Sequence, residues 1–232
     1  MAKTTAKKNS SKETWIVVDE FGDVAKDHVS KTKVRSRTYG LGISVVNDKD
    51  KFIKVSQNIK KEMGVKDELK GRKVKGVHKE QAVRQIHDIG TKTYGFYIDK
   101  DKKDNPVYWG TKDRQYPALI TLQQSLRKVI DKRKMGNVHV VVDKSELYRD
   151  KTYMKNGKPV KNQKLGEFAV KTVLQEKGIE TTPDFHSSRN DDESGKMLQT
   201  NDIVTNSIWE HTEFKNKKYT KGLHTKVKRI KR

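Results

Sequence analysis

The sequence predicts an α/β fold in which helices flank a mixed β-sheet. Its first part contains short runs of β-branched and aromatic residues separated by turn residues, the pattern of an antiparallel β meander. In the later part, segments whose apolar residues recur at helical spacing alternate with further apolar runs. A meander followed by alternating helices and strands is typical of a layered α/β domain.

The predicted meander has three strands. Residues 14–18 (TWIVV) form the first strand, and the turn-forming sequence 19–22 (DEFG) follows it. Residues 39–46 (YGLGISVV) and 51–55 are the next two strands, on either side of a turn at 47–50.

The remaining elements alternate between helix and strand. Apolar positions at helical spacing predict a long helix with Pro117 in its first turn, and the apolar run NVHVVV predicts a buried strand that stops at Asp143. In chain order, we expect a helix at 78–89, a strand at 93–98, a helix at 117–134, a strand at 137–142, a helix at 165–177, a strand at 179–185 and a helix at 196–211.

Positive charge dominates the composition and is concentrated at the two ends of the chain. The 232 residues include 52 Lys and Arg against 30 Asp and Glu, a formal charge of +22. We expect three parts: a basic flexible N-terminal arm (1–12), one folded domain (13–212) and a basic C-terminal arm (213–232). Such an excess of Lys and Arg predicts binding to DNA or RNA through the phosphates.

Several classes of protein and site are excluded by residue content. The chain has no cysteine, and therefore no disulfide and no thiolate zinc site, which fits a cytoplasmic protein. It contains no apolar segment long enough to span a membrane and no phosphate-binding Walker motif, so neither a membrane nor a nucleotide cofactor is expected.

Three aspartates are the main candidates for chemistry. Asp19 and Asp143 each follow an apolar strand, where α/β folds place ligands, although most such residues are turn formers or helix caps. On the last predicted helix, Asp202 shares the inward face of Leu198 and Trp209. A buried carboxylate needs a cation, and spacing alone does not distinguish a metal ion from a Lys or Arg.

A fourth acid lies between the meander and the next helix. Glu68 and Glu80 are both candidates, and the sequence does not decide between them. Three or four convergent carboxylates would suit two Mg²⁺ ions at a phosphodiester bond. Lys70 would then contact the scissile phosphate or hold a carboxylate in place.

The order of these motifs resembles the domain of unknown function 3800 family of bacteria, phages and mobile elements. The resemblance implies a divergent ribonuclease H-like fold, with a carboxylate cluster that binds Mg²⁺ or Mn²⁺ and acts on nucleic acid. Phe21 departs from the serine that is usual there. The matching residues are Asp19, Glu20, Gly22, Glu68, Lys70, Asp143, Leu198, Gln199 and Asp202.

The sequence therefore supports one function above two others. The first is a Mg²⁺- or Mn²⁺-dependent nuclease in which Asp19, Asp143 and Asp202 bind metal, Glu68 or alternatively Glu20 completes the cluster, and Lys70 meets the phosphate. The second is a non-catalytic basic protein that binds nucleic acid on the same fold, its acids salt-bridged. The third is a module that binds an acidic protein partner.

Overall fold

The computed structural model describes residues 13–22, 36–100, 115–144, 151–155, 158–163 and 165–230. The strands are β1 (Glu13–Gly22), β2 (Thr38–Val46), β3 (Lys92–Asp99), β4 (Asn137–Asp143), β5 (Lys151–Lys155), β6 (Lys158–Gln163), β7 (Asp184–His186) and β8 (Lys226–Arg229). The helices are α1 (Lys49–Glu62), the 3₁₀ turn η1 (Gly71–Lys73), α2 (Gly76–Asp88), α3 (Gln115–Val129), α4 (Leu165–Glu176), α5 (Glu193–Phe214) and α6 (Lys218–Gly222). The predicted N-terminal arm at 1–12 lies outside these residues.

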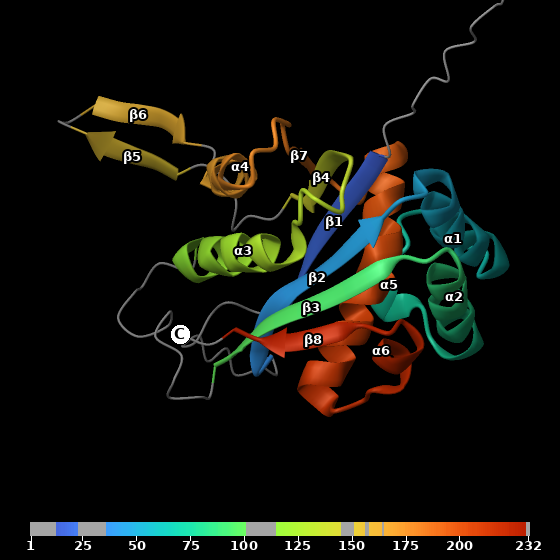
Figure 1. The fold of residues 1–232 in the computed structure, drawn as a ribbon. Coiled ribbons are helices and arrows are strands. Elements are labelled where there is room, and N and C mark those ends of the chain that lie inside the picture. The colour runs from blue at the N-terminus through green and yellow to red at the C-terminus, as the bar shows by residue number, and fades with distance from the viewer. Residues whose placement is uncertain are drawn as a thin grey trace, which may run out of the picture.

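Six strands form one mixed sheet in the order β7-β4-β1-β2-β3-β8, while β5 and β6 form a separate antiparallel pair. Strands β1, β2 and β3 are antiparallel neighbours, as a meander requires, and β4 runs parallel to β1. Helices α3 and α4 lie on one side of the sheet, and α1, α2 and α5 lie on the other (Figure 1). The α/β prediction with a helix-flanked mixed sheet is confirmed.

Successive side chains of the central strands point alternately into two apolar cores, one on each face of the sheet. In β1, Ile16 and Val18 pack toward α3 and α4, whereas Val17 and Phe21 pack toward α5. Successive side chains of a strand point to opposite faces, so Asp19 shares the α5 face with Val17. This alternation determines which acids can meet.

Helix α5 is buried along most of its length and lies against the centre of the sheet (Figure 1). Two of its buried polar side chains, Thr200 and Asn201, make hydrogen bonds to neighbouring elements. Asn201, which is fully buried, accepts a bond from Ser44 Oγ at 2.6 Å and donates one to the Gly42 carbonyl at 3.1 Å. Close approach also depends on Gly42, where a Cβ would lie 2.3 Å from Thr205 Oγ1.

Two predicted elements differ in the structure. The strand expected at 51–55 is the start of α1, because the Asp48 side chain accepts a hydrogen bond from Lys51 N at 3.1 Å and caps a helix whose buried residues include Phe52, Ser56 and Ile59. The prediction of a turn at 19–22 is also wrong. Strand β1 continues through it, with Asp19 paired to Gly42 and Gly22 to Tyr39.

The ends of three other elements are shifted. The helix predicted to reach residue 134 ends at Val129, and the strand predicted at 179–185 is the short β7. The last helix is longer than predicted and begins at Glu193.

The predicted C-terminal arm belongs to the folded body over its described part. Strand β8 pairs in parallel with β3, and Leu223 and Ile230 are buried. Thr93 Oγ1 donates a hydrogen bond to the Leu223 carbonyl at 3.2 Å. Its buried apolar side chains hold this basic segment against the sheet, which net charge alone does not reveal.

Replacing Asp192 with Ala should lower the free energy of unfolding by about 1 kcal/mol, because this residue caps the N-terminus of α5. Its carboxylate accepts a hydrogen bond from Gly195 N at 2.9 Å and lies 2.7 Å from His186 Nε2. Urea unfolding would measure the change. Asp191→Ala is the matched control, since its 82% exposed side chain faces only Lys196 at 3.6 Å; an equal loss there would contradict the capping role.

Candidate active site

The pairing of β1 with β4 brings Asp19 beside Asp143. The two strands are parallel with Val18 opposite Val142, so the next residue on each strand is an aspartate. Val141 packs toward α5, and Asp143, two residues later, faces the same way. The sequence placed Asp19 after its strand, whereas the structure places it inside β1, at the level where β4 ends.

Helix α5 supplies Asp202 on the same face of the sheet. Its carboxylate Oδ2 accepts a hydrogen bond from Gly71 N at 2.9 Å, which ties η1 to the helix. Gly71 is required for this approach, because a Cβ there would lie 2.2 Å from the carbonyl oxygen of Asp202. Three segments far apart in the sequence thus converge around one group of acids.

Burial and neighbouring acids raise the pKa values of the three aspartates. Burial raises the pKa of Asp19 well above its usual value, and the charges of Asp202, Asp143 and Glu20 raise it further. Burial also raises the pKa of Asp143 and of Asp202, against hydrogen bonds and the charge of Lys70, which act to lower both. A further cation near these carboxylates, in addition to the Lys70 ammonium group, would therefore be stabilised electrostatically.

Glu68 and Lys70 lie beside the aspartates as an ion pair. Lys70 Nζ is 2.5 Å from Glu68 Oε1 and 3.5 Å from Ser188 Oγ. Burial acts to raise the pKa of Glu68, but hydrogen bonds from Lys70 and Ser188 outweigh it and lower the pKa. Burial likewise acts to lower the pKa of Lys70, yet its bond to Glu68 and the charges of Asp202 and Asp143 leave that pKa raised.

Ser188 is a site residue that the sequence did not reveal. Its hydroxyl donates to Glu68, and its backbone N–H donates to Asp143 Oδ1 at 3.4 Å. Gln199 holds the surrounding loops, donating to the Ser188 carbonyl at 2.9 Å and accepting from Leu69 N at 3.2 Å. The position of Ser188 just after β7, a parallel strand next to β4, is the signal that could have identified it.

The structure separates the other two candidate acids from this group. Glu20 follows Asp19 and points to the opposite face, where Tyr39 OH donates to its Oε2 at 3.2 Å. Glu80 is exposed on α2 and pairs with Lys218 at 2.6 Å. The structure therefore brings together Asp19, Glu68, Lys70, Asp143 and Asp202, but not Glu20.

The donor set suits a hard divalent cation. Carboxylate oxygens are the ligands that Mg²⁺ and Mn²⁺ prefer, and the charges of Asp143 and Asp202 both raise the pKa of Asp19, as expected for carboxylates that lie near one another. Within the described residues, however, no three His, Asp or Glu side chains are already arranged to hold a metal ion.

Comparison with known proteins bears on the fold. No family model matches the chain, and no curated protein matches it. A chain of the PCNA:RNase HII complex from Archaeoglobus fulgidus is similar in structure, with a TM-score of 0.50 and 13% sequence identity over 90% of this chain and 78% of that one. No helix in the described ranges has the length and apolar character to cross a lipid bilayer. The mixed α/β architecture is consistent with a ribonuclease H-like fold.

Proposed function

We propose that this protein is a divalent-metal-dependent nuclease on a ribonuclease H-like fold. The observation that carries the proposal is the convergence of Asp19, Asp143 and Asp202, from β1, β4 and α5, on one face of the sheet, where the charges of Asp143 and Asp202 raise the pKa of Asp19. The structural likeness to the ribonuclease HII complex and the motif order of the domain of unknown function 3800 family support it.

Each residue has a role in this proposal. Asp19, Asp143 and Asp202 would hold Mg²⁺ or Mn²⁺, which when bound supplies the positive charge that acidifies a water molecule and stabilises the leaving oxygen of a phosphodiester. Lys70, paired with Glu68, presents its ammonium group at the edge of the acids, where it can contact a substrate phosphate. Ser188 and Gln199 keep Glu68 and the Lys70 loop in place.

The positive charge supplies affinity for the substrate. With 52 basic residues against 30 acidic ones, the chain attracts a polyanion and should bind DNA or RNA with steep salt dependence. The carboxylates would otherwise repel phosphate, so a bound cation and Lys70 are both needed at the centre of the site.

One observation favours a second candidate, the non-catalytic nucleic-acid-binding protein. Lys70 already provides a cation to the acids, and no three acidic or histidine side chains in the described part of the chain are preset for metal. In that case Lys70 would serve as the permanent counter-ion of the cluster, and binding would not depend on divalent metal.

Replacing Asp143 with Asn should reduce cleavage by ~10³-fold, because a metal ligand is lost from the centre of the site. Initial rates would be measured with Mg²⁺ or Mn²⁺ on labelled single-stranded and duplex DNA, RNA and hybrid substrates, and EDTA should abolish cleavage by the wild type. Glu80→Gln is the matched control, since Glu80 pairs with Lys218 away from the aspartates. Binding without cleavage under every metal condition would support the non-catalytic protein instead.

A further inference from the structure

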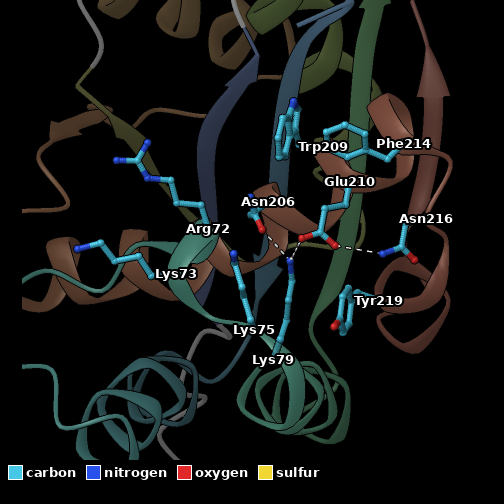
Figure 2. A pocket seen from close by; sticks show the side chains of 10 residues that line it. All are labelled: Arg72, Lys73, Lys75, Lys79, Asn206, Trp209, Glu210, Phe214, Asn216 and Tyr219. Atoms are coloured by element: carbon cyan, nitrogen blue, oxygen red, sulfur yellow. Dashed lines mark hydrogen bonds and ion pairs between the residues drawn. The ribbon is translucent and has the colours of Figure 1, made fainter. Parts of the chain in front are cut away.

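An open cavity of about 700 Å³ lies next to the candidate active site. It is formed by η1, the start of α2, the end of α5 and the segment that leads into α6 (Figure 2). Its size is within the range of pockets that hold small ligands, roughly 300–1,000 Å³. The lining residues are Arg72, Lys73, Lys75, Lys79, Asn206, Trp209, Glu210, Phe214, Asn216 and Tyr219.

Aromatic rings form one side of this cavity. Trp209 and Phe214 meet edge to face, with ring centroids 5.0 Å apart and planes at 83°. The side chain of Phe214 is 62% exposed, which makes it one of three large apolar side chains exposed among the described residues. Exposed aromatic rings present flat surfaces on which a nucleic-acid base can stack.

Basic side chains form the other side. Arg72, Lys73 and Lys75 line the cavity; in Figure 2 Lys75 points toward its interior, whereas Arg72 and Lys73 extend along its outer edge. All three are exposed, and none makes an ion pair with a side chain that the structure describes. They are therefore available to contact phosphates.

The acid in the cavity is already neutralised. Glu210 lies 2.6 Å from the ammonium group of Lys79, which is only 1% exposed and also donates to Asn206 Oδ1 at 2.6 Å. Asn216 Nδ2 donates to the other oxygen of Glu210 at 3.3 Å (Figure 2). The cavity is left with a net positive charge, and its polar interior is largely occupied by internal bonds.

The cavity is lined by residues that follow those of the candidate active site on two segments of the chain. Gly71 binds Asp202, and the next two residues of the chain, Arg72 and Lys73, line the cavity. On α5, Asn206 is one turn beyond Asp202, and Trp209 is about 10 Å along the helix axis from it. A strand with one phosphate at the aspartates would reach the rings with a neighbouring nucleotide.

We infer that this cavity binds an unpaired nucleotide of the substrate, with its base on Trp209 and Phe214 and its phosphates at Arg72, Lys73 and Lys75. The inference rests on the proposed nuclease and assigns its substrate class: single-stranded nucleic acid, or duplex with a locally unpaired strand. A base within a duplex keeps both faces stacked on its neighbours and cannot lie on these rings. Because the Asn206 carbonyl and the Asn216 amide are engaged internally, recognition relies on stacking and tolerates different bases.

The test is fluorescence anisotropy of short labelled oligonucleotides binding to the full chain in EDTA, where cleavage cannot interfere. Phe214→Ala should weaken binding of a single strand by about tenfold and leave binding of the matching duplex almost unchanged. Phe214→Tyr should restore it, because a ring returns. Phe168→Ala, at a 71% exposed phenylalanine on α4 outside the cavity, is the matched control and should have no effect.

The basic side is tested with Arg72→Gln and Lys75→Gln together. This pair should reduce the dependence of log Kd on log salt by about 1.4, since each phosphate contact to a single strand contributes about 0.7. Lys54→Gln with Lys61→Gln, exposed on α1 outside the lining, removes the same charge and should change the slope less.

Unchanged single-strand affinity in Phe214→Ala, or an equal loss with duplex, overturns the inference. If the wild-type protein cleaves no substrate under any metal condition, the proposed nuclease fails. The binding measurements described above test only the cavity.

Discussion

The Asp19→Asn protein should be inactive, and it should also be more stable than the wild type when divalent metal is absent. Asp19 is 7% exposed, and burial followed by the charges of Asp202, Asp143 and Glu20 opposes its ionisation. Asn has nearly the same shape, can still accept the hydrogen bond from Glu20 N, and carries no charge. Removing a poorly compensated buried charge should raise the free energy of unfolding by roughly 1–3 kcal/mol.

The difference in stability between the wild type and Asp19→Asn should depend on pH. Because the pKa of Asp19 is raised in the folded state, the native protein holds a proton that the unfolded chain releases above the ordinary aspartate pKa of 3.8. The wild type should therefore lose more stability than Asp19→Asn as pH rises from there through the raised pKa, because Asp143 and Asp202 still titrate in both proteins. The two proteins should differ little in acid and most at neutral pH.

Urea unfolding at several pH values in EDTA measures this difference. Mg²⁺ should then stabilise the wild type at neutral pH, because it binds the folded state, and should stabilise Asp19→Asn much less. Equal unfolding curves for the two proteins in EDTA at neutral pH would contradict the repulsion at Asp19. Equal stabilisation of the two proteins by Mg²⁺ would contradict the metal site.

Gly71→Ala should cause a large combined loss of stability and activity. The new Cβ would lie 2.2 Å from the Asp202 carbonyl oxygen, 2.6 Å from its carbon and 2.9 Å from Ile203 N. All three are backbone atoms of a buried helix, so η1 has to move away and the Gly71–Asp202 hydrogen bond is lost. Overpacking of this kind costs about 1–3 kcal/mol.

Denaturation and initial cleavage rates would be compared with Gly222→Ala. At exposed Gly222 the added methyl meets only a side-chain atom, Val83 Cγ1 at 2.7 Å, so the change should be smaller. If Gly71→Ala is as stable and as active as the control, η1 does not position Lys70 relative to Asp202.

The sequence predicts the centre of this molecule better than its periphery. Apolar runs identified β1, β2, β3 and β4 because buried strands are made of β-branched residues, and Asp143 was recognisable as the residue that ends one of them. Helix α5 was found through Leu198, Asp202 and Trp209. Its full extent was not, because buried polar residues such as Thr200 and Asn201 make hydrogen bonds that only the tertiary structure provides.

The errors have physical causes. Phe52, Ile53 and Val55 read as a strand in a five-residue window, but Ile59 and the Asp48 cap belong to the same helix and lie outside that window. Asp19 and Glu20 are adjacent in the sequence, and both were candidate metal ligands. Because successive side chains of a strand point to opposite faces, the two lie on opposite sides of the sheet. Ser188 could not be singled out, since its role depends on contacts with Glu68, more than a hundred residues earlier.

The position of α5 in the chain also affects how the protein is made. Asp19 and Asp143 emerge from the ribosome first, but Asp202 comes on a helix that ends at Phe214, and β8 joins the sheet later still. A growing chain exposes its N-terminal part first and folds as units become complete. Until α5 has been synthesised, this basic nascent chain therefore lies beside ribosomal RNA without an assembled carboxylate cluster. For the proposed nuclease, this order of elements would delay cleavage until α5 has been made.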